Sequence, residues 1–339
     1  MTTASRFSEV DDRIAAFWLW WSTAAPALAD DLLAGQGARW QPELSERVRD
    51  LHPRLQWDLR VAAGPLFTLC LSGAGDAVVR LVAERWRVTA PDDDPRWAFR
   101  STRPAAGRVA EVSLRIGGEM VQLDEVRVAV EDDPGRERLN LVVYHPVFAQ
   151  LPTATRESLA VLLLDHALGE DVVESWTGAI DAATACPADA LEISGLLRAL
   201  DDRRDRATGT HWGVVTAESP DGMLFRIANH AVKRWSYPTF DARCDIVLPL
   251  ERRTPAGIPD PWESDELKGI EEGLQRALAE RVLIVGRTSG RNEHVVHLYA
   301  REDSIAPQAI AVWARRMQRP VSVSWTFDPE WSVLTERPS

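Results

Sequence analysis

Closely spaced histidines and carboxylates are the residues of this chain best suited to acid–base chemistry or metal binding. His166 and Glu170 stand four residues apart, a spacing that can place two metal ligands on one face of a helix. Gly169 lies between them and predicts the end of that helix, and two ligands do not complete a metal site. We therefore expect no metal here, and the sequence indicates no cofactor.

A second pair of histidines predicts a polar surface instead of a metal site. His294 and His297 are three residues apart in an expected strand, so they point to opposite faces and cannot bind one metal together. If the face that carries His297 is open, it forms a mixed polar surface suited to protein binding. The alternative is a face that is solvated or covered by another domain. The candidate binding residues on this face are Arg243, Asp245, His297, Tyr299, Ser322, Ser324 and Thr326.

The stretch "LSGAGDA" places Gly73 and Gly75 between a strand and a helix, where backbone N–H groups can bind phosphate. The third glycine of a dinucleotide loop and the lysine of a P-loop are both absent, so we expect a plain turn. The patterns G-x-S-x-G, H-E-x-x-H and C-x-x-C are missing, and no set of Ser, His and Asp is evident. The motifs of common enzymes therefore argue against catalysis.

The distribution of charge along the chain argues against some classes of binding partner. Residues 1–205 hold 22 Arg and Lys against 33 Asp and Glu, so nearly all of the net charge of −12 belongs to this part. Such a field repels phosphate backbones and anionic membranes. Three arginines near a helix end, Arg315, Arg316 and Arg319, are explained by the helix dipole. RNA-reading sheets need exposed aromatic residues on central strands, and only Tyr299 qualifies, so nucleic acid is an unlikely partner.

Two features indicate a cytoplasmic protein. The three cysteines, Cys70, Cys186 and Cys244, are isolated in the sequence, which favours buried thiols over disulfides or zinc ligands. The apolar stretch at 14–29 is too short to span a membrane, contains Pro26 and follows acidic residues in place of a basic signal region. We expect no membrane association.

The length of 339 residues predicts two domains, and the first is assigned to residues 1–205. Its expected fold is an antiparallel meander packed with helices. Apolar periodicity predicts helices at 14–32, 44–55, 77–86, 153–169 and 191–200, and alternation predicts strands at 57–61, 67–71, 97–103, 112–121, 126–130, 139–144 and 176–180. The charged run "DDRRDRATG" at 201–209 is the predicted linker.

The second domain, 206–339, is predicted to be α+β with a ferredoxin-like fold. After a hairpin at 212–229, the expected order is β-α-β-β-α-β, with strands at 244–250, 282–287, 294–300 and 321–327 and helices at 260–278 and 310–317. This order predicts a four-stranded antiparallel sheet with two helices on one face. Asp260, Pro261 and Glu263 predict the start of the first helix.

Two of the chain's 14 tryptophans lie close to its C-terminus. Trp325 alternates with Ser324 and Thr326, which predicts a core position beneath Trp313. Trp331 follows an Asp-Pro step and is expected to fold back over the end of the sheet.

The segments "DGMLFRIAN", "GIPDPWESDELKGIEEGL", "TSGRNEHVVHLYARED" and "FDPEW" together resemble the DUF695 family, a bacterial domain of unknown function, over about residues 210–333. The first half is similar to the region that accompanies this module. The family carries no known activity, but related chains pair it with a domain similar to the RraB inhibitor of ribonuclease E. The resemblance therefore implies regulation by protein contact. Many members have "GRE" where this chain has Gly290-Arg291-Asn292-Glu293.

Two functions of different classes follow from these observations. The first is a non-catalytic protein-binding or regulatory protein, similar to an inhibitor or immunity protein, which presents a sheet face to an unidentified protein partner. The alternative is an enzyme that acts on a small molecule in a cleft between residues 1–205 and 206–339, where His145, His211, His230 and Asp241 converge.

Overall fold

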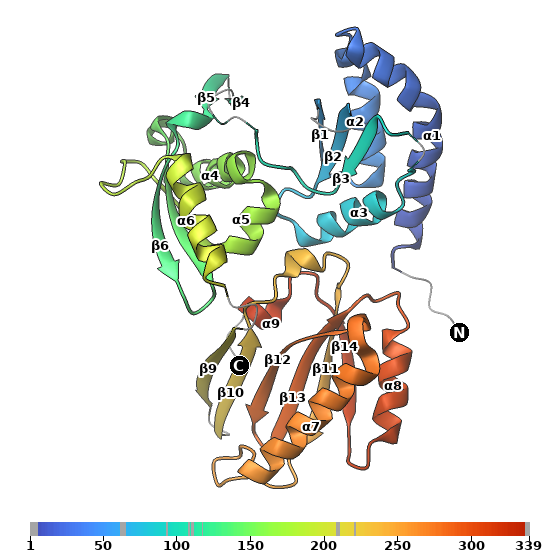
Figure 1. Ribbon diagram of the computed structural model, residues 1–339, viewed down its shortest axis with the longest axis vertical. Helices are drawn as coiled ribbons and strands as arrows, with labels where there is room; N and C mark the ends of the chain where they lie inside the picture. The colour runs from blue at the N-terminus through green and yellow to red at the C-terminus, as the bar shows by residue number, and fades with distance from the viewer. Residues whose placement is uncertain are drawn as a thin grey trace. The chain divides into compact units, whose positions relative to one another are not determined.

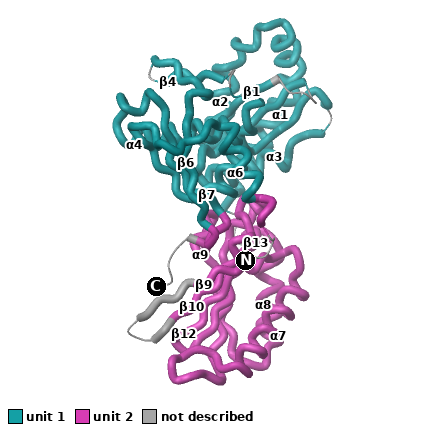
Figure 2. The backbone as a smooth tube through the Cα atoms, turned by 60° about the vertical axis from the view of Figure 1, so that its left-hand side comes forward, with its two compact units in different colours: residues 1–133, 138–203 teal, residues 134–137, 204–339 magenta. Residues whose placement is uncertain are grey.

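The computed structural model describes residues 6–61, 66–92, 94–107, 109, 112–116, 118–207, 211–219 and 222–335. The protein is α+β and contains several separate sheets. The chain forms two compact units, shown in Figure 2. Unit 1 comprises residues 1–133 and 138–203, and unit 2 comprises residues 134–137 and 204–339.

The first part of unit 1 packs three helices on a small sheet. These elements are α1 (Ser8–Leu33), α2 (Gln41–Leu51), β1 (Gln56–Val61), β2 (Phe67–Ser72), α3 (Ala77–Val88) and β3 (Trp97–Arg100). The core is rich in aromatic residues: Phe17 and Trp21 of α1 pack with Trp86 of α3 and Trp97 of β3. Asp76 caps α3, because its side chain accepts a hydrogen bond from the N–H of Val79.

The second part of unit 1 repeats this plan with a separate core. It contains the hairpin β4 (Ser113–Ile116) and β5 (Glu119–Gln122), the strands β6 (Arg127–Asp133), β7 (Arg138–Tyr144) and β8 (Thr177–Ala183), and the helices α4 (Thr153–Leu168), α5 (Glu170–Trp176) and α6 (Ile193–Asp205). Gly169 ends α4 with a φ of 85°, as its sequence position predicts. Leu141, Phe148 and Leu163 lie at the centre of this core.

The predicted antiparallel meander of unit 1 is wrong. The strands form three separate sheets, and β3 pairs parallel to β2 while β8 pairs parallel to β7. The physical reason is the connection: α3 links β2 to β3, and α4 with α5 links β7 to β8. A helical crossover returns the chain in the same direction, whereas a meander needs tight turns.

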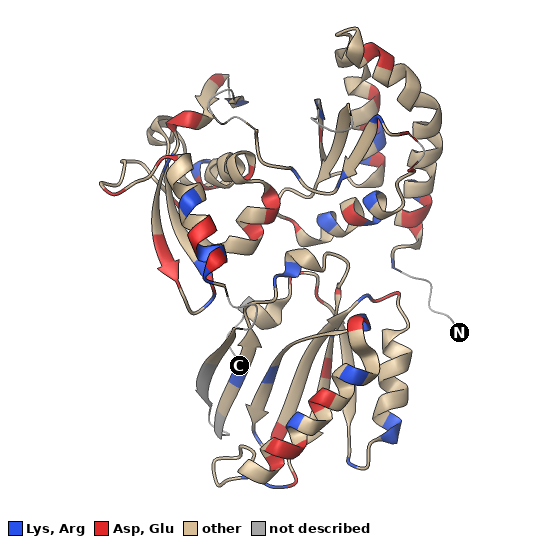
Figure 3. Ribbon diagram, viewed as in Figure 1, with Lys and Arg blue, Asp and Glu red and all other residues tan. Residues whose placement is uncertain are grey.

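The charged run at 201–209 is not entirely a linker, because α6 continues to Asp205. The colours of Figure 3 mark Asp, Glu, Lys and Arg positions along the end of this helix. Arg203 is buried and lies 3.6 Å from the carboxylate of Asp132. The run is therefore anchored to unit 1 through this arginine.

Unit 2 contains a six-stranded antiparallel sheet in the order β14-β11-β13-β12-β10-β9. The strands are β9 (Trp212–Ser219), β10 (Gly222–Asn229), β11 (Ala242–Pro249), β12 (Leu283–Gly290), β13 (Glu293–Ala300) and β14 (Ser322–Phe327), and the helices are α7 (Pro261–Leu278), α8 (Ala306–Arg316) and the short α9 (Ser332–Thr335). The prediction of four strands is wrong, because the hairpin β9–β10 pairs with β12 and extends the sheet.

Helices α7 and α8 cover one face of this sheet, and α7 crosses in front of β13 in Figure 1. Leu274 and Leu278 of α7 and Ile310 of α8 pack there against Ile246 and Leu298. Trp325 lies at the margin of this core, half-buried, close to its predicted position. In the part of the chain that the structure describes, no helix has the length and apolar composition needed to cross a membrane.

Candidate functional site

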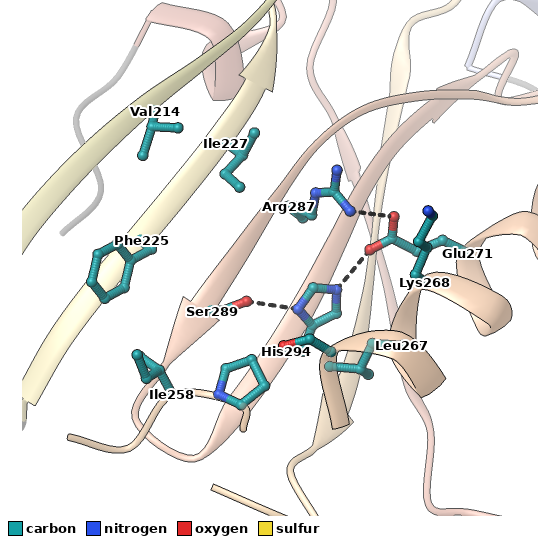
Figure 4. A pocket seen from close by; sticks show the side chains of 12 residues that line it. Val214, Phe225, Ile227, Ile258, Leu267, Lys268, Glu271, Arg287, Ser289 and His294 are labelled. Carbon is teal, nitrogen blue, oxygen red and sulfur yellow. Dashed lines mark hydrogen bonds and ion pairs between the residues drawn. The ribbon is translucent and has the colours of Figure 1, made fainter. Parts of the chain in front are cut away.

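A cavity of about 340 Å³ lies in unit 2, between α7 and the strands β9, β10, β12 and β13 of the six-stranded sheet. One side is apolar and comes from β9 and β10, through Val214, Phe225 and Ile227. Ile258 and Leu267 continue this apolar lining toward α7, and Figure 4 shows these side chains around the opening. The volume lies within the range of pockets that bind small molecules or single side chains.

The other side of the pocket is polar and charged. It is lined by Lys268 and Glu271 of α7, by Arg287 and Ser289 of β12, and by His294 of β13. The Nη1 atom of Arg287 donates to Oε2 of Glu271 at 2.9 Å. Among the described residues, Lys268 has no hydrogen-bond or ion-pair partner. The pocket therefore combines an apolar floor with a net positive wall, in a chain that is acidic overall.

Ser289, His294 and Glu271 form a continuous hydrogen-bonded chain on this wall (Figure 4). The Oγ atom of Ser289 lies 2.7 Å from Nδ1 of His294, and Nε2 of His294 lies 2.9 Å from Oε1 of Glu271. His294 is buried, whereas the two partners are half-buried. A hydroxyl, an imidazole and a carboxylate in this order are the groups that activate a serine nucleophile in hydrolases.

The placement of Glu271 follows from the sequence of α7. Asp260 accepts a hydrogen bond from the N–H of Glu263 at 2.8 Å, so the helix begins at the predicted cap. Leu267 and Leu274 are both buried against the sheet. Because residues three and four apart share a helix face, Glu271 is carried onto the sheet side between them.

The hairpin β12–β13 brings Ser289 opposite His294, a pairing that the sequence prediction missed. Its strands continue to Gly290 and from Glu293, so only Arg291 and Asn292 form the turn. Both residues have positive φ, 52° and 67°, as a two-residue hairpin turn requires. Counting back from a two-residue turn would have paired Ser289 with His294. Arginine is a poor residue for positive φ, which conceals this signal.

The opposite face of the sheet carries a second relay, built on His297. Its Nδ1 atom lies 2.7 Å from Oδ1 of Asp245, and its Nε2 atom lies 2.8 Å from Oγ1 of Thr288. Burial lowers the pKa of His297, and the bond to Asp245 offsets this only in part. Burial raises the pKa of Asp245, but hydrogen bonds from His297 and Arg243 outweigh it, so the net shift is downward.

The C-terminal residues cover the face on which the candidate binding surface was predicted. Tyr299 is fully buried: its hydroxyl donates to Oδ2 of Asp328 at 2.6 Å, and its ring stacks on Trp331. The expectation of an exposed aromatic residue at Tyr299 is therefore wrong. The reason is that the chain folds back after the Asp328-Pro329 step, which places Trp331 on this face.

The seven candidate binding residues thus occupy different environments. Arg243 and Asp245 are half-buried and form an ion pair of 2.7 Å, and His297 is buried beside them. The exposed members are the three on the edge strand β14, namely Ser322, Ser324 and Thr326. Their role in binding stays a prediction.

The other predicted constellations are engaged in internal contacts. Glu170 accepts hydrogen bonds from the hydroxyl of Ser72 and from the N–H of Arg103. Ser72 also accepts a hydrogen bond from the N–H of Ala74. This backbone N–H of the glycine loop is therefore already bound to a side chain of the protein. Within the described residues, no group of three or more His, Cys, Asp or Glu has a geometry suited to a metal ion.

The residues of the alternative enzyme site fall in both units. In unit 1, Nδ1 of His145 accepts from the N–H of Val147 at 3.1 Å. In unit 2, the rings of His211 and His230 lie 6.3 Å apart, and Asp241 accepts from the backbone N–H of Glu302. Their convergence in one cleft stays a prediction.

Comparison with known proteins yields no relative for this chain. No protein-family model matches it, and no curated protein or solved structure gives a significant match.

Proposed function

We propose that this chain is a regulatory protein that binds another protein, and that the partner inserts an apolar side chain into the pocket of unit 2. The observation that carries this proposal is the apolar side of the pocket on β9 and β10. Val214 there is 62% exposed, and Phe225 and Ile227 are only half-buried. Exposed apolar side chains that gather at a pocket are typical of binding surfaces.

The rim of the pocket also has the residue types that dominate binding energy in interfaces. The guanidinium of Arg287 lies 5.1 Å from the centre of the Trp212 ring, and this tryptophan is 40% exposed. Tryptophan and arginine are enriched among the residues whose truncation costs most binding energy. This pair supports a contact surface that begins at β9 and continues into the pocket.

The architecture supports a module of the ferredoxin-like type. We infer that β11, β12, β13 and β14 with α7 and α8 form this module, since they follow the β-α-β-β-α-β order with strand order β14-β11-β13-β12. The hairpin β9–β10 then adds two strands and one side of the pocket. The resemblance to the DUF695 family and the regulatory role it implies are part of the same proposal.

A cytoplasmic location completes the proposal. All three cysteines are free thiols, as is usual in a reducing compartment; Cys70 and Cys244 are buried as predicted, but the prediction is wrong for Cys186, which is exposed. Nearly all of the net charge of −12 belongs to residues 1–205, so that part of the chain disfavours nucleic acid and anionic membranes as partners.

The proposal is tested by a single charge placed at the pocket. Immobilised wild-type chain should retain one protein in stoichiometric amount from a lysate, identified by mass spectrometry. The variant Val214→Asp should lose that protein, because the partner's apolar group would meet a carboxylate. Val214 is exposed, so this substitution leaves the core of unit 2 intact.

Val312→Asp is the matched control, because Val312 is an exposed valine on α8 away from the pocket. It should retain the partner at the wild-type level. Recovery of the same protein by Val214→Asp, or failure of the wild-type chain to retain any protein stoichiometrically, would contradict the proposal.

A further inference from the structure

The chain of contacts from Ser289 to Glu271 has a defined direction of proton donation. The Glu271 carboxylate accepts from Arg287 on Oε2, which leaves Oε1 as the acceptor for His294. An ionised carboxylate only accepts hydrogen bonds, so the neutral imidazole carries its proton on Nε2. Its Nδ1 atom then has a lone pair directed at the Ser289 hydroxyl, 2.7 Å away. This is the arrangement of a general base beside a nucleophile.

The imidazole of His294 is held in a fixed orientation, as a general base requires. His294 is 3% exposed and is bonded at both ring nitrogens, so its ring cannot turn without losing two hydrogen bonds. Ser289 is paired with His294 across the β12–β13 ladder, and Glu271 is fixed on α7. Each member therefore lies on a regular element, which holds the geometry better than a loop.

We propose that Ser289 is the nucleophile of an acyl-transfer reaction, with His294 as its general base, and that the substrate is an ester of a small apolar carboxylic acid. The Oγ atom attacks the ester carbonyl carbon as its proton passes to Nδ1 of His294. The carbonyl–alkoxide bond then breaks, and His294 returns the proton to the leaving alkoxide, which departs as an alcohol. Ser289 retains the acyl group.

Hydrolysis completes the cycle with the same groups. A water molecule attacks the acyl carbon and gives a proton to His294, the bond to Ser289 Oγ breaks, and His294 returns the proton to Oγ. One ester and one water give one acid and one alcohol, and no other reactant is needed. Glu271 acts as a positioning residue, since it orients the imidazole and stabilises its protonated form.

The lining of the pocket defines the substrate class. Val214, Phe225 and Ile227 offer an apolar surface for the acyl chain on the side facing the relay. The cavity of about 340 Å³ suits a short acyl group. Lys268 and Arg287 supply positive charge on the wall where negative charge develops on the carbonyl oxygen.

The second relay of the sheet supplies an internal control. Thr288 makes the equivalent contact with His297, 2.8 Å from Nε2, but it belongs to the opposite face and does not line the pocket. Its hydroxyl is therefore not available to an ester in the pocket. Thr288→Val removes a hydroxyl–histidine contact on the same strand without affecting the proposed nucleophile.

The experiment uses the full isolated chain, so its result is independent of protein-partner capture. The chain is treated with an alkyl fluorophosphonate, and the modified peptide is identified by mass spectrometry; hydrolysis of 4-nitrophenyl butyrate is measured in parallel. We expect the adduct on Ser289. Ser289→Ala should abolish labelling and reduce hydrolysis at least about 100-fold, the usual contribution of such groups. Thr288→Val should behave as wild type.

Variants of the relay separate a catalytic role from a structural one. His294→Gln should slow labelling of Ser289 strongly. Glu271→Gln should slow labelling less than His294→Gln, because the amide oxygen can still accept from His294 but carries no charge to stabilise the protonated imidazole. A folded wild-type chain without an adduct on Ser289, or hydrolysis equal in wild type and Ser289→Ala, would overturn the proposal even if His294→Gln failed to fold.

Discussion

The rings of Tyr299 and Trp331 stack with their centres 4.5 Å apart and their planes inclined by 15°. The indole Nε1 of Trp331 also donates to the carbonyl of Phe240 at 2.7 Å. Through these contacts Trp331 becomes part of the sheet's core on the side away from α7 and α8. The positive φ of Trp331, 57°, is maintained by this packing, since such a conformation is unfavourable for a residue with a side chain.

Trp331→Ala should destabilise the chain by about 3 to 5 kcal/mol, the usual cost of removing a buried indole. Trp331 is 1% exposed, and its loss uncovers Tyr299. Urea denaturation followed by circular dichroism measures the change. Trp262→Ala is the matched control, because Trp262 is 74% exposed and its removal should change the free energy of unfolding by less than about 0.5 kcal/mol. Equal effects of the two substitutions would refute this account.

A buried ion pair joins the first turn of α7 to the segment that follows α8. The Nη2 atom of Arg319 lies 2.7 Å from Oε1 of Glu263, and both side chains are nearly inaccessible to water. Arg319 was expected to complement the dipole of the preceding helix. Helix α8 ends at Arg316, so Arg319 lies outside it. Its guanidinium instead binds Glu263 in the first turn of α7. The glutamate of the predicted cap thus anchors this arginine.

Arg319→Met should cost about 3 to 5 kcal/mol, because it leaves the Glu263 carboxylate buried without its counter-ion. The double variant Arg319→Met with Glu263→Gln should be more stable than Arg319→Met alone, since it removes the unpaired charge. Unfolding free energies from urea titrations of wild type, both single variants and the double variant test this. If the two substitutions are additive, the ion pair has no special role.

Asp165 and Glu170 bring two carboxyl groups close together in unit 1. Burial, reinforced by the charge of Glu170, raises the pKa of Asp165 to about 7. The folded chain therefore holds this proton up to about pH 7, whereas the unfolded chain releases it near 3.8. The folded state binds more protons than the unfolded state in this window. Asp165 therefore lowers the free energy of unfolding as the pH rises from about 4 to 7.

Asp165→Asn should gain stability relative to wild type by up to about 1.4 kcal/mol per pH unit across that window, and the gain should level off above pH 7. Burial lowers the pKa of the neighbouring His166 to about 4, which has the opposite effect between about pH 6.5 and 4. His166 is present in both proteins and cancels in the comparison. Denaturation at pH 5 and pH 8 measures the difference.

Asp189→Asn is the control, because Asp189 is exposed. The difference between this variant and wild type should not change between pH 5 and pH 8. A pH-independent difference for Asp165→Asn would show that the folded chain does not hold the extra proton.

Two glycine substitutions should have opposite signs. Gly169 has a φ of 85°, and an added Cβ would lie 2.9 Å from the backbone nitrogen of Ala105, so Gly169→Ala should destabilise the chain by more than about 1 kcal/mol. Gly273 lies inside α7 with no atom near the position of a Cβ. Gly273→Ala should stabilise the chain by about 0.5 to 1 kcal/mol. Thermal or urea unfolding distinguishes the two, and the same sign for both would contradict the argument.

Local signals of the sequence predicted many elements well. The cap at Asp260, the end of α4 at Gly169 and the strands β1 and β2 all follow from short-range chemistry that does not depend on the rest of the fold. The error in unit 1 concerned pairing: whether β3 runs parallel or antiparallel to β2 depends on the path of α3. Strand pairing joins residues that are distant in sequence. The apolar alternation of a strand indicates which of its faces is buried, but not which strand pairs with it.

The candidate site illustrates the same division. The sequence by itself placed His294 and His297 on opposite faces of one strand, because side chains alternate along an extended backbone. Tertiary structure decided which face is open. Trp331 packs on the face of Tyr299 and His297, whereas His294, on the other face, lines a cavity between α7 and β10. Alternation is a property of the backbone, whereas exposure depends on which distant segment packs against each face.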